Sequence, residues 1–69
     1  MSQEIRNILA NNIKQLRTNK KLKREELSLM LGFDNSYISK LEKSRINITL
    51  DKLEQIAKYF KTEPYKLLK

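Results

Sequence analysis

The sequence predicts an all-α fold of five short helices. Its 69 residues include a single glycine, Gly32, and a single proline, Pro64. A chain of β-hairpins would normally need more turn residues than that. Apolar residues recur at helical spacing along almost the whole chain, and no repeat or linker divides it. We therefore expect one domain over residues 1–69.

The first helix is indicated by an apolar stripe over residues 5–16, which is about four helical turns. Ser2 is placed to cap its N-terminus, and Glu4 lies in the first turn, where the helix dipole favours a carboxylate. The segment 18–21, TNKK, then breaks the apolar pattern. The stripe and the cap together predict a helix that packs one face on a core.

The second helix is expected over residues 24–31, REELSLML. Its inward positions are expected to be Leu27, Met30 and Leu31. Gly32 follows directly and suits the left-handed residue that often ends a helix.

Three further helices follow in the same way. Asp34 is placed to cap a third helix that runs to about Lys43, and residues 44–48 are irregular. Thr49 can cap a fourth helix, and Pro64 suits the first turn of a short fifth helix, PYKLLK. The apolar positions of the fourth helix are Leu50, Leu53, Ile56, Ala57 and Phe60.

The charge balance points to a polyanionic partner. Fifteen Lys and Arg residues face eight Asp and Glu residues, which gives a net charge of +7. A small basic domain of this kind suits DNA, RNA or an anionic membrane, although the same lysines could serve solubility alone. The chain has no cysteine and no histidine, so the commonest thiol, zinc and general-base chemistry is excluded. We expect neither an enzyme nor a cofactor.

The sequence predicts a soluble cytoplasmic protein. Its start, MSQEIRN, is too polar for a secretory signal, and no apolar run approaches the roughly 18 residues of a membrane span.

The third helix has few apolar residues. At 100° per residue, Ile38, Leu41 and Glu42 share one arc. The opposite arc carries hydroxyl and ammonium groups, on Ser36, Ser39, Lys40 and Lys43. Such groups hydrogen-bond base edges or phosphates in a major groove, but an ordinary solvated face has the same composition.

Two features favour a DNA-reading helix. The preceding helix is short and ends in a three-residue turn with glycine, GFD, which is typical of a helix-turn-helix. In addition, Glu42 on the packed side needs a partner, and Arg17 follows Ile13 by four residues along the first helix. We predict a buried Arg17–Glu42 ion pair; the alternative is two unrelated surface charges.

The ordered segments EEL, LGFD, SYISKLE, LDKLEQIAKYF and EPYKLL resemble the Cro/phage-repressor (Cro/C1-type, XRE) helix-turn-helix superfamily, from Ile5 through Leu68. Within it, DNSYISKLEKSRINITL is similar to the controller proteins of restriction–modification systems. The resemblance implies a phage-repressor-like fold in which the second and third helices form the motif. It also implies a homodimer that binds a near-palindromic DNA operator and regulates transcription of its own gene and an endonuclease gene.

The resemblance implies roles for individual residues of this sequence. Asn35, Ser36, Ser39 and Lys40 match positions that reach base edges, and Arg17 with Glu42 matches a buried ion pair of the family. The full set of matched DNA-binding positions is Arg24, Asn35, Ser36, Tyr37, Ser39, Lys40, Lys43, Ser44, Arg45 and Asn47.

The sequence also departs from the family pattern. Lys21 stands where glycine is common, so that turn is expected to be strained or rebuilt. Lys23 replaces the usual Ser or Thr cap, and Arg24 replaces a glutamine. Asn35 and Ile46 stand where controllers often carry arginine, and Asn prefers adenine whereas Arg prefers guanine. The operator sequence of a relative therefore does not transfer to this chain.

A dimer contact is expected near the C-terminal end, through Tyr59, Tyr65, Leu67 and Leu68, unless the two leucines simply close the core. If the dimer binds beside a promoter, RNA polymerase is a further partner. If the dimer covers the promoter, it blocks RNA polymerase from binding there. An antitoxin that binds both its operator and a toxin protein is the alternative function. RNA binding is disfavoured because no cluster of aromatic residues is present.

Overall fold

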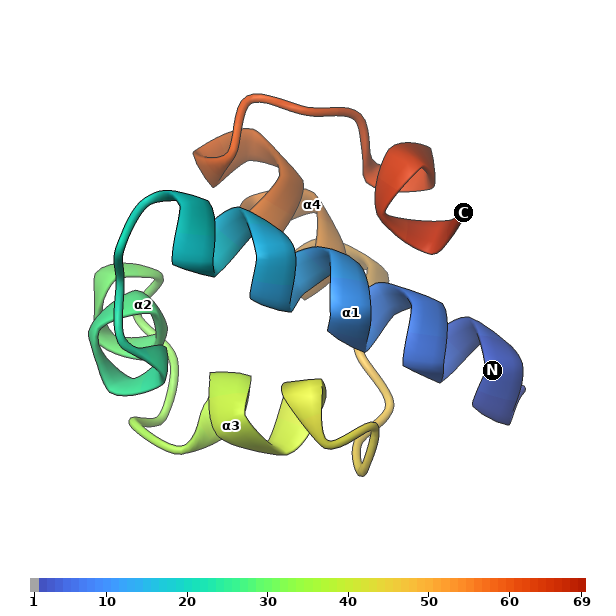
Figure 1. Cartoon of the computed structure of the whole chain (residues 1–69), viewed down its shortest axis with the longest axis horizontal. Coiled ribbons are helices and arrows are strands. Elements are labelled where there is room, and N and C mark those ends of the chain that lie inside the picture. The colour runs from blue at the N-terminus through green and yellow to red at the C-terminus, as the bar shows by residue number, and fades with distance from the viewer. Residues whose placement is uncertain (1) are drawn as a thin grey trace.

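The computed structural model describes residues 2–69, so Met1 of the expected 1–69 domain lies outside the described residues. All regular elements in this part of the chain are helical, as predicted (Figure 1). They are α1 (Gln3–Asn19), α2 (Arg24–Met30), α3 (Tyr37–Glu42), α4 (Leu50–Tyr59) and the 3₁₀ helix η1 (Pro64–Leu68).

The predicted short fifth helix is present, but it is a 3₁₀ helix and not an α-helix. The Lys66 N–H donates to the Glu63 carbonyl at 3.0 Å, which is the i to i+3 pattern of this tighter helix. The segment has only five residues, and Pro64 at its start contributes no N–H group. A short turn of this kind closes with fewer residues than an α-helix needs.

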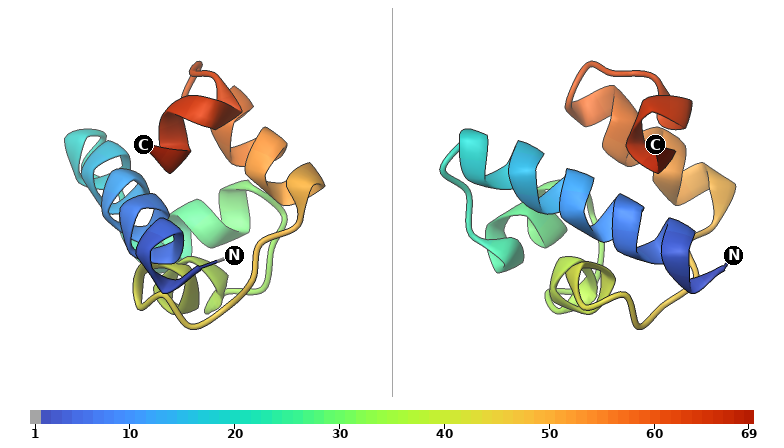
Figure 2. Two further views of the ribbon diagram at one scale, coloured as in Figure 1. Left: turned by 90° about the vertical axis from the view of Figure 1, so that its right-hand side faces the viewer. Right: turned by 45° about the vertical axis from the view of Figure 1, so that its right-hand side comes forward.

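The helices surround a single core. In both views of Figure 2, α3 and η1 lie apart from each other, and α1 packs against each of them. Each of the five elements contributes buried apolar side chains to one cluster. Its members are Leu9, Ile13, Leu27, Ile38, Leu41, Leu53, Ile56, Ala57 and Leu67.

Two of the predicted N-terminal caps are confirmed. The Ser2 hydroxyl accepts a hydrogen bond from the Ile5 N–H at 3.2 Å, and the Thr49 hydroxyl accepts one from the Lys52 N–H at 3.2 Å. Each cap satisfies one of the free N–H groups in the first turn of its helix.

The caps of α2 and α3 differ from the simple expectation. Lys23 has no side-chain acceptor, and its own N–H donates to the Glu26 carboxylate at 2.8 Å. Asp34 does not cap α3 directly, because α3 begins only at Tyr37. Its carboxylate instead accepts from the Ser36 hydroxyl at 2.5 Å and from the Ser36 N–H at 3.3 Å. These bonds lower the pKa of Asp34 and order the turn that leads into α3.

All four α-helices end on a residue in the left-handed region, with φ between 57° and 76° at Lys21, Gly32, Ser44 and Lys61. At the end of α2, the Gly32 N–H donates to the Leu29 carbonyl and the Phe33 N–H donates to the Ser28 carbonyl, which is a Schellman motif. The turn at Lys21 therefore keeps the left-handed conformation without glycine. For a residue with a Cβ this costs about 1–2 kcal/mol.

Three apolar residues of the predicted stripes are exposed. Ile5 is 37% exposed, Met30 is 56% exposed and Leu50 is 82% exposed. Leu50 is the first residue of α4, where the chain has just entered from the loop, and Met30 is the last residue of α2. On α2, the side chain that is buried in place of Met30 is a polar one, Ser28, which is fully buried.

No helix in residues 2–69 combines the length and the hydropathy that crossing a lipid bilayer requires.

Candidate nucleic-acid interface

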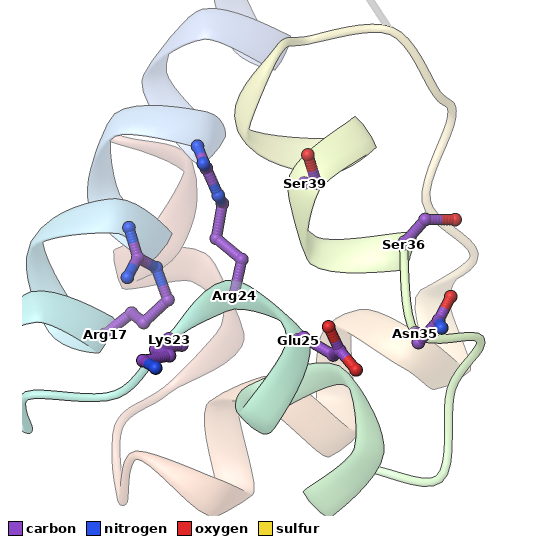
Figure 3. Close-up of a pocket in the computed structure, with 7 residues that line it drawn as sticks. All are labelled: Arg17, Lys23, Arg24, Glu25, Asn35, Ser36 and Ser39. Carbon is purple, nitrogen blue, oxygen red and sulfur yellow. The ribbon is translucent and has the colours of Figure 1, made fainter.

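A polar groove of about 620 Å³ lies beside the first turns of α2 and α3 (Figure 3). It brings together four of the ten predicted DNA-binding residues: Arg24, Asn35, Ser36 and Ser39. Arg17, Lys23 and Glu25 complete the lining. Figure 3 shows the Arg24 side chain extending between α1 and α3. The groove thus gathers hydroxyl, carboxamide and guanidinium groups on one open face.

These groups suit the edges of nucleic-acid bases and the phosphates beside them. The Asn35 carboxamide offers a donor and an acceptor together, which matches the N6 and N7 positions of adenine. The Ser36 and Ser39 hydroxyls can donate or accept, and the Arg24 guanidinium donates to a phosphate or to guanine. Lys23 and Glu25 were not predicted for this face. The consecutive cations Lys23 and Arg24 were a usable signal in the sequence, whereas nothing singled out Glu25.

The predicted Arg17–Glu42 ion pair is present beneath this face. The Arg17 Nε lies 2.7 Å from Glu42 Oε2, and Nη2 lies 3.2 Å from Oε1. The third contact of the guanidinium is a hydrogen bond from Nη1 to the Leu22 carbonyl at 2.6 Å. The two side chains are 11% and 4% exposed. One side chain therefore fixes α3 and the α1–α2 turn to the same point on α1.

A second contact inside the motif involves the buried Ser28. Its hydroxyl donates to the Arg24 carbonyl at 2.9 Å and accepts from the Ile38 N–H at 3.0 Å. The Ile38 N–H lies in the first turn of α3, where it has no partner within the helix. A side chain of α2 thus caps α3. Sequence reasoning missed Ser28, whose only signal is a polar residue inside an apolar run.

The remaining predicted contacts lie outside the groove. Lys40, Lys43 and Arg45 are exposed, and Ser44 is the half-buried left-handed residue that ends α3. Asn47 is exposed in the loop between α3 and α4. These residues extend the polar surface from the groove toward that loop.

Comparison with known proteins identifies the arrangement. A helix-turn-helix family profile matches residues 13–67, which is most of the chain. The chain belongs to the Cro/C1-type helix-turn-helix family. This is a DNA-binding family and not an enzyme family.

The helix-turn-helix chain is similar to a hypothetical transcription factor of Neisseria meningitidis serogroup B, with 38% identity over 66 residues. That alignment covers 96% of this chain but only 62% of the relative, so the chain spans less than two thirds of that protein. It is also 35% identical over 65 residues to control protein C.SmaI of Serratia marcescens, covering 94% of this chain and 77% of the relative.

A solved structure shares the fold closely. The restriction–modification controller protein C.AhdI of Aeromonas hydrophila superposes with a TM-score of 0.80 at 29% sequence identity. The superposition covers 90% of this helix-turn-helix chain and 94% of the controller.

Tyr37 does not line the groove of the helix-turn-helix, and its DNA contact stays a prediction. Its ring meets the Phe33 ring edge-on with 4.8 Å between centroids, and the Lys52 Nζ lies 4.5 Å from the Tyr37 centroid. The phenolic oxygen is buried without a hydrogen-bond partner among the described residues, and this burial raises the pKa of Tyr37. Tyr37 therefore packs α3 against α4.

Replacing Tyr37 by phenylalanine is expected to raise the free energy of unfolding by about 1 kcal/mol, because the change removes a buried hydroxyl that has no partner. DNA affinity is expected to stay within about twofold of wild type, since the ring remains in place. Denaturant unfolding and fluorescence anisotropy with labelled DNA measure the two quantities. A large loss of DNA affinity with unchanged stability would instead support the predicted contact of the Tyr37 hydroxyl with DNA.

The four predicted dimer residues do not form one surface of the helix-turn-helix domain. Leu67 is 2% exposed and belongs to the core, which favours the alternative that this leucine closes the core. Tyr59 packs toward the other end of the molecule, where its hydroxyl lies 3.7 Å from the Met30 sulfur. Tyr65 is 58% exposed and Leu68 is partly exposed, and both lie on η1.

Proposed function

We propose that the protein is a sequence-specific DNA-binding regulator of transcription that acts as a homodimer on a near-palindromic operator. The observation that carries the proposal is the groove beside α2 and α3, where Arg24, Asn35 and Ser39 line one open face. The Arg17–Glu42 pair beneath that face holds α3 at a fixed position on α1. A reading helix needs such a rigid support, because base-edge hydrogen bonds tolerate little misplacement.

Affinity and specificity have separate sources in this proposal. Exposed cations such as Lys43 and Arg45 neutralise phosphates and release counterions, which supplies affinity that does not depend on sequence. Asn35, Ser39 and Lys40 contact base edges in the major groove, which supplies specificity. Asn35 favours adenine at its position, so an A·T pair is expected in each half-site.

A dimer follows from the small size of the reading surface. The α3 helix spans only Tyr37–Glu42, so one copy reads few base pairs. Two copies related by a two-fold axis read half-sites about 34 Å apart, which is one turn of DNA. Tyr65 and Leu68 on η1 support a contact between copies, because they place apolar surface in solvent.

The setting we propose is the control of a restriction–modification system. It rests on the similarity to C.AhdI, a restriction–modification controller protein, and to control protein C.SmaI. A dimer bound beside a promoter would contact RNA polymerase, whereas a dimer bound over a promoter would exclude it. We treat residues 1–69 as one DNA-binding domain, since the described helices share a single core.

Sedimentation with and without DNA tests the dimer and the DNA target together. At micromolar concentration the free protein is expected to sediment at twice its 8.2 kDa chain mass. A duplex taken from directly upstream of its own gene is expected to bind two chains, and a duplex of shuffled sequence is expected to bind more weakly. A monomer in both samples would contradict the homodimer, and equal binding to both duplexes would contradict sequence-specific recognition.

A further inference from the structure

The loop between α3 and α4 is tied to the N-terminal end of α1 by a contact that joins residues 41 positions apart. The Arg6 Nε donates to the Asn47 Oδ1 at 3.0 Å, and the Arg6 Nη2 donates to the same oxygen. Arg6 lies in the first turns of α1 and is outside residues 13–67, the part of the chain that the family profile matches. The contact therefore joins a residue outside the matched helix-turn-helix region to a loop residue inside it.

The chemistry of this pair leaves only donors facing outward. A guanidinium has no acceptor, so the carboxamide of Asn47 must turn its oxygen toward Arg6 and its NH₂ group away. The remaining N–H groups of Arg6 are donors as well. The ion pair found among residues 2–69 joins Arg17 to Glu42, so the charge of Arg6 is not neutralised by a carboxylate within 4.0 Å. The two side chains together form a cationic site that can donate but cannot accept.

The position of the pair suits the DNA backbone. The loop leaves the C-terminal end of α3 and stays on the α3 side of the molecule before it reaches α4 (Figure 1). The same loop carries Arg45, and Lys43 ends α3 next to it; both are exposed. Asn47 itself is exposed, and Arg6 is half-buried beside it. A DNA strand that passes the end of α3 would meet all of these donors.

We propose that Arg6 and Asn47 form a clamp for one phosphodiester of the DNA backbone at the edge of the half-site. Arg6 supplies the charge and fixes the orientation of the Asn47 amide, and both residues donate to the phosphate oxygens. The clamp rests on the proposed DNA-binding function and adds to it a contact residue from α1, outside the two helices of the motif. Such a contact positions α3 along the duplex without reading a base.

Two variants separate a phosphate clamp from a merely structural tie. Arg6→Gln is expected to lower affinity for the upstream duplex by roughly tenfold, because a charge-assisted bond to phosphate is lost. It is also expected to reduce the slope of log K against log salt by about 0.9 for each bound subunit. Asn47→Asp keeps the tie and converts it into an ion pair, so thermal stability is expected to be maintained or raised. DNA affinity is nevertheless expected to fall, because a carboxylate now faces the phosphate.

Lys14→Gln is the charge-matched control, since Lys14 is exposed two turns further along the same helix. It is expected to leave the salt slope nearly unchanged. The clamp is overturned if Arg6→Gln matches Lys14→Gln in affinity and slope, or if Asn47→Asp binds DNA as well as wild type. Wild-type protein that fails to bind the upstream duplex would overturn the proposed function first, and the clamp with it.

Discussion

Replacing Arg17 by alanine is expected to lower the free energy of unfolding by about 3–5 kcal/mol. The Glu42 side chain is only 4% exposed, so its carboxylate would remain buried without a counter-charge. The Leu22 carbonyl would lose its hydrogen bond from the guanidinium as well. A chain of 69 residues has a total stability of roughly 3–10 kcal/mol, so much of the variant is expected to be unfolded at room temperature. Urea unfolding followed by circular dichroism measures the difference.

Two further variants show whether the loss comes from the lone charge. Lys14→Ala removes a cation from the exposed face of the same helix and is expected to change stability by less than about 0.5 kcal/mol. The double variant Arg17→Met with Glu42→Leu leaves no buried charge and is expected to recover most of the stability. An Arg17→Ala variant as stable as Lys14→Ala would show that the pair contributes little.

Replacing Ser28 by alanine is expected to cost about 1–3 kcal/mol, because the Ile38 N–H would be buried without an acceptor. The effect arises at the junction of α2 and α3, so it should appear in hydrogen exchange as faster exchange of the Ile38 amide. Native-state exchange and denaturant unfolding measure the local and the global effect.

Ser39 provides the contrast, because it is a half-exposed serine of the same motif that lines the groove. Ser39→Ala is expected to leave stability within about 0.5 kcal/mol of wild type while weakening DNA binding. If Ser28→Ala left both the stability and the Ile38 amide unchanged, the proposed capping of α3 by α2 would be wrong.

Helical spacing of apolar residues, N-terminal capping residues and a helix-ending glycine predicted most of the fold. The stripe over residues 5–16 and the caps at Ser2 and Thr49 depend on residues close together along one helix. The structure has both caps, and it packs the stripe on the core except at Ile5, which is exposed. Gly32 ends α2 with φ of 76°, a left-handed conformation that glycine adopts without the backbone cost borne by a residue with a Cβ. The Arg17–Glu42 pair was predictable across 25 positions because both residues border apolar stripes that must face the same core.

The features that the sequence did not predict depend on contacts between different helices and loops. Helical spacing places both Ser28 and Met30 near the inward side of α2, and only the fit against α3 decides that the serine is buried. Tyr37 has a polar end that suits DNA, but its ring packs against Phe33 and Lys52 and its hydroxyl is buried, which helical spacing alone does not indicate. The Arg6–Asn47 contact joins a helix to an irregular loop, where no periodicity applies.

Binding of the Lys40→Ala variant to two duplexes tests most directly whether the outer side of α3 reads DNA sequence. Lys40 is exposed on that side, and Lys14→Ala serves as the control for lost charge. We predict that Lys40→Ala lowers affinity for the upstream duplex by roughly tenfold and for a shuffled duplex far less, since a base-edge contact contributes only to the correct sequence. Equal losses on both duplexes, or no loss on either, would contradict the assignment of α3 as the reading helix.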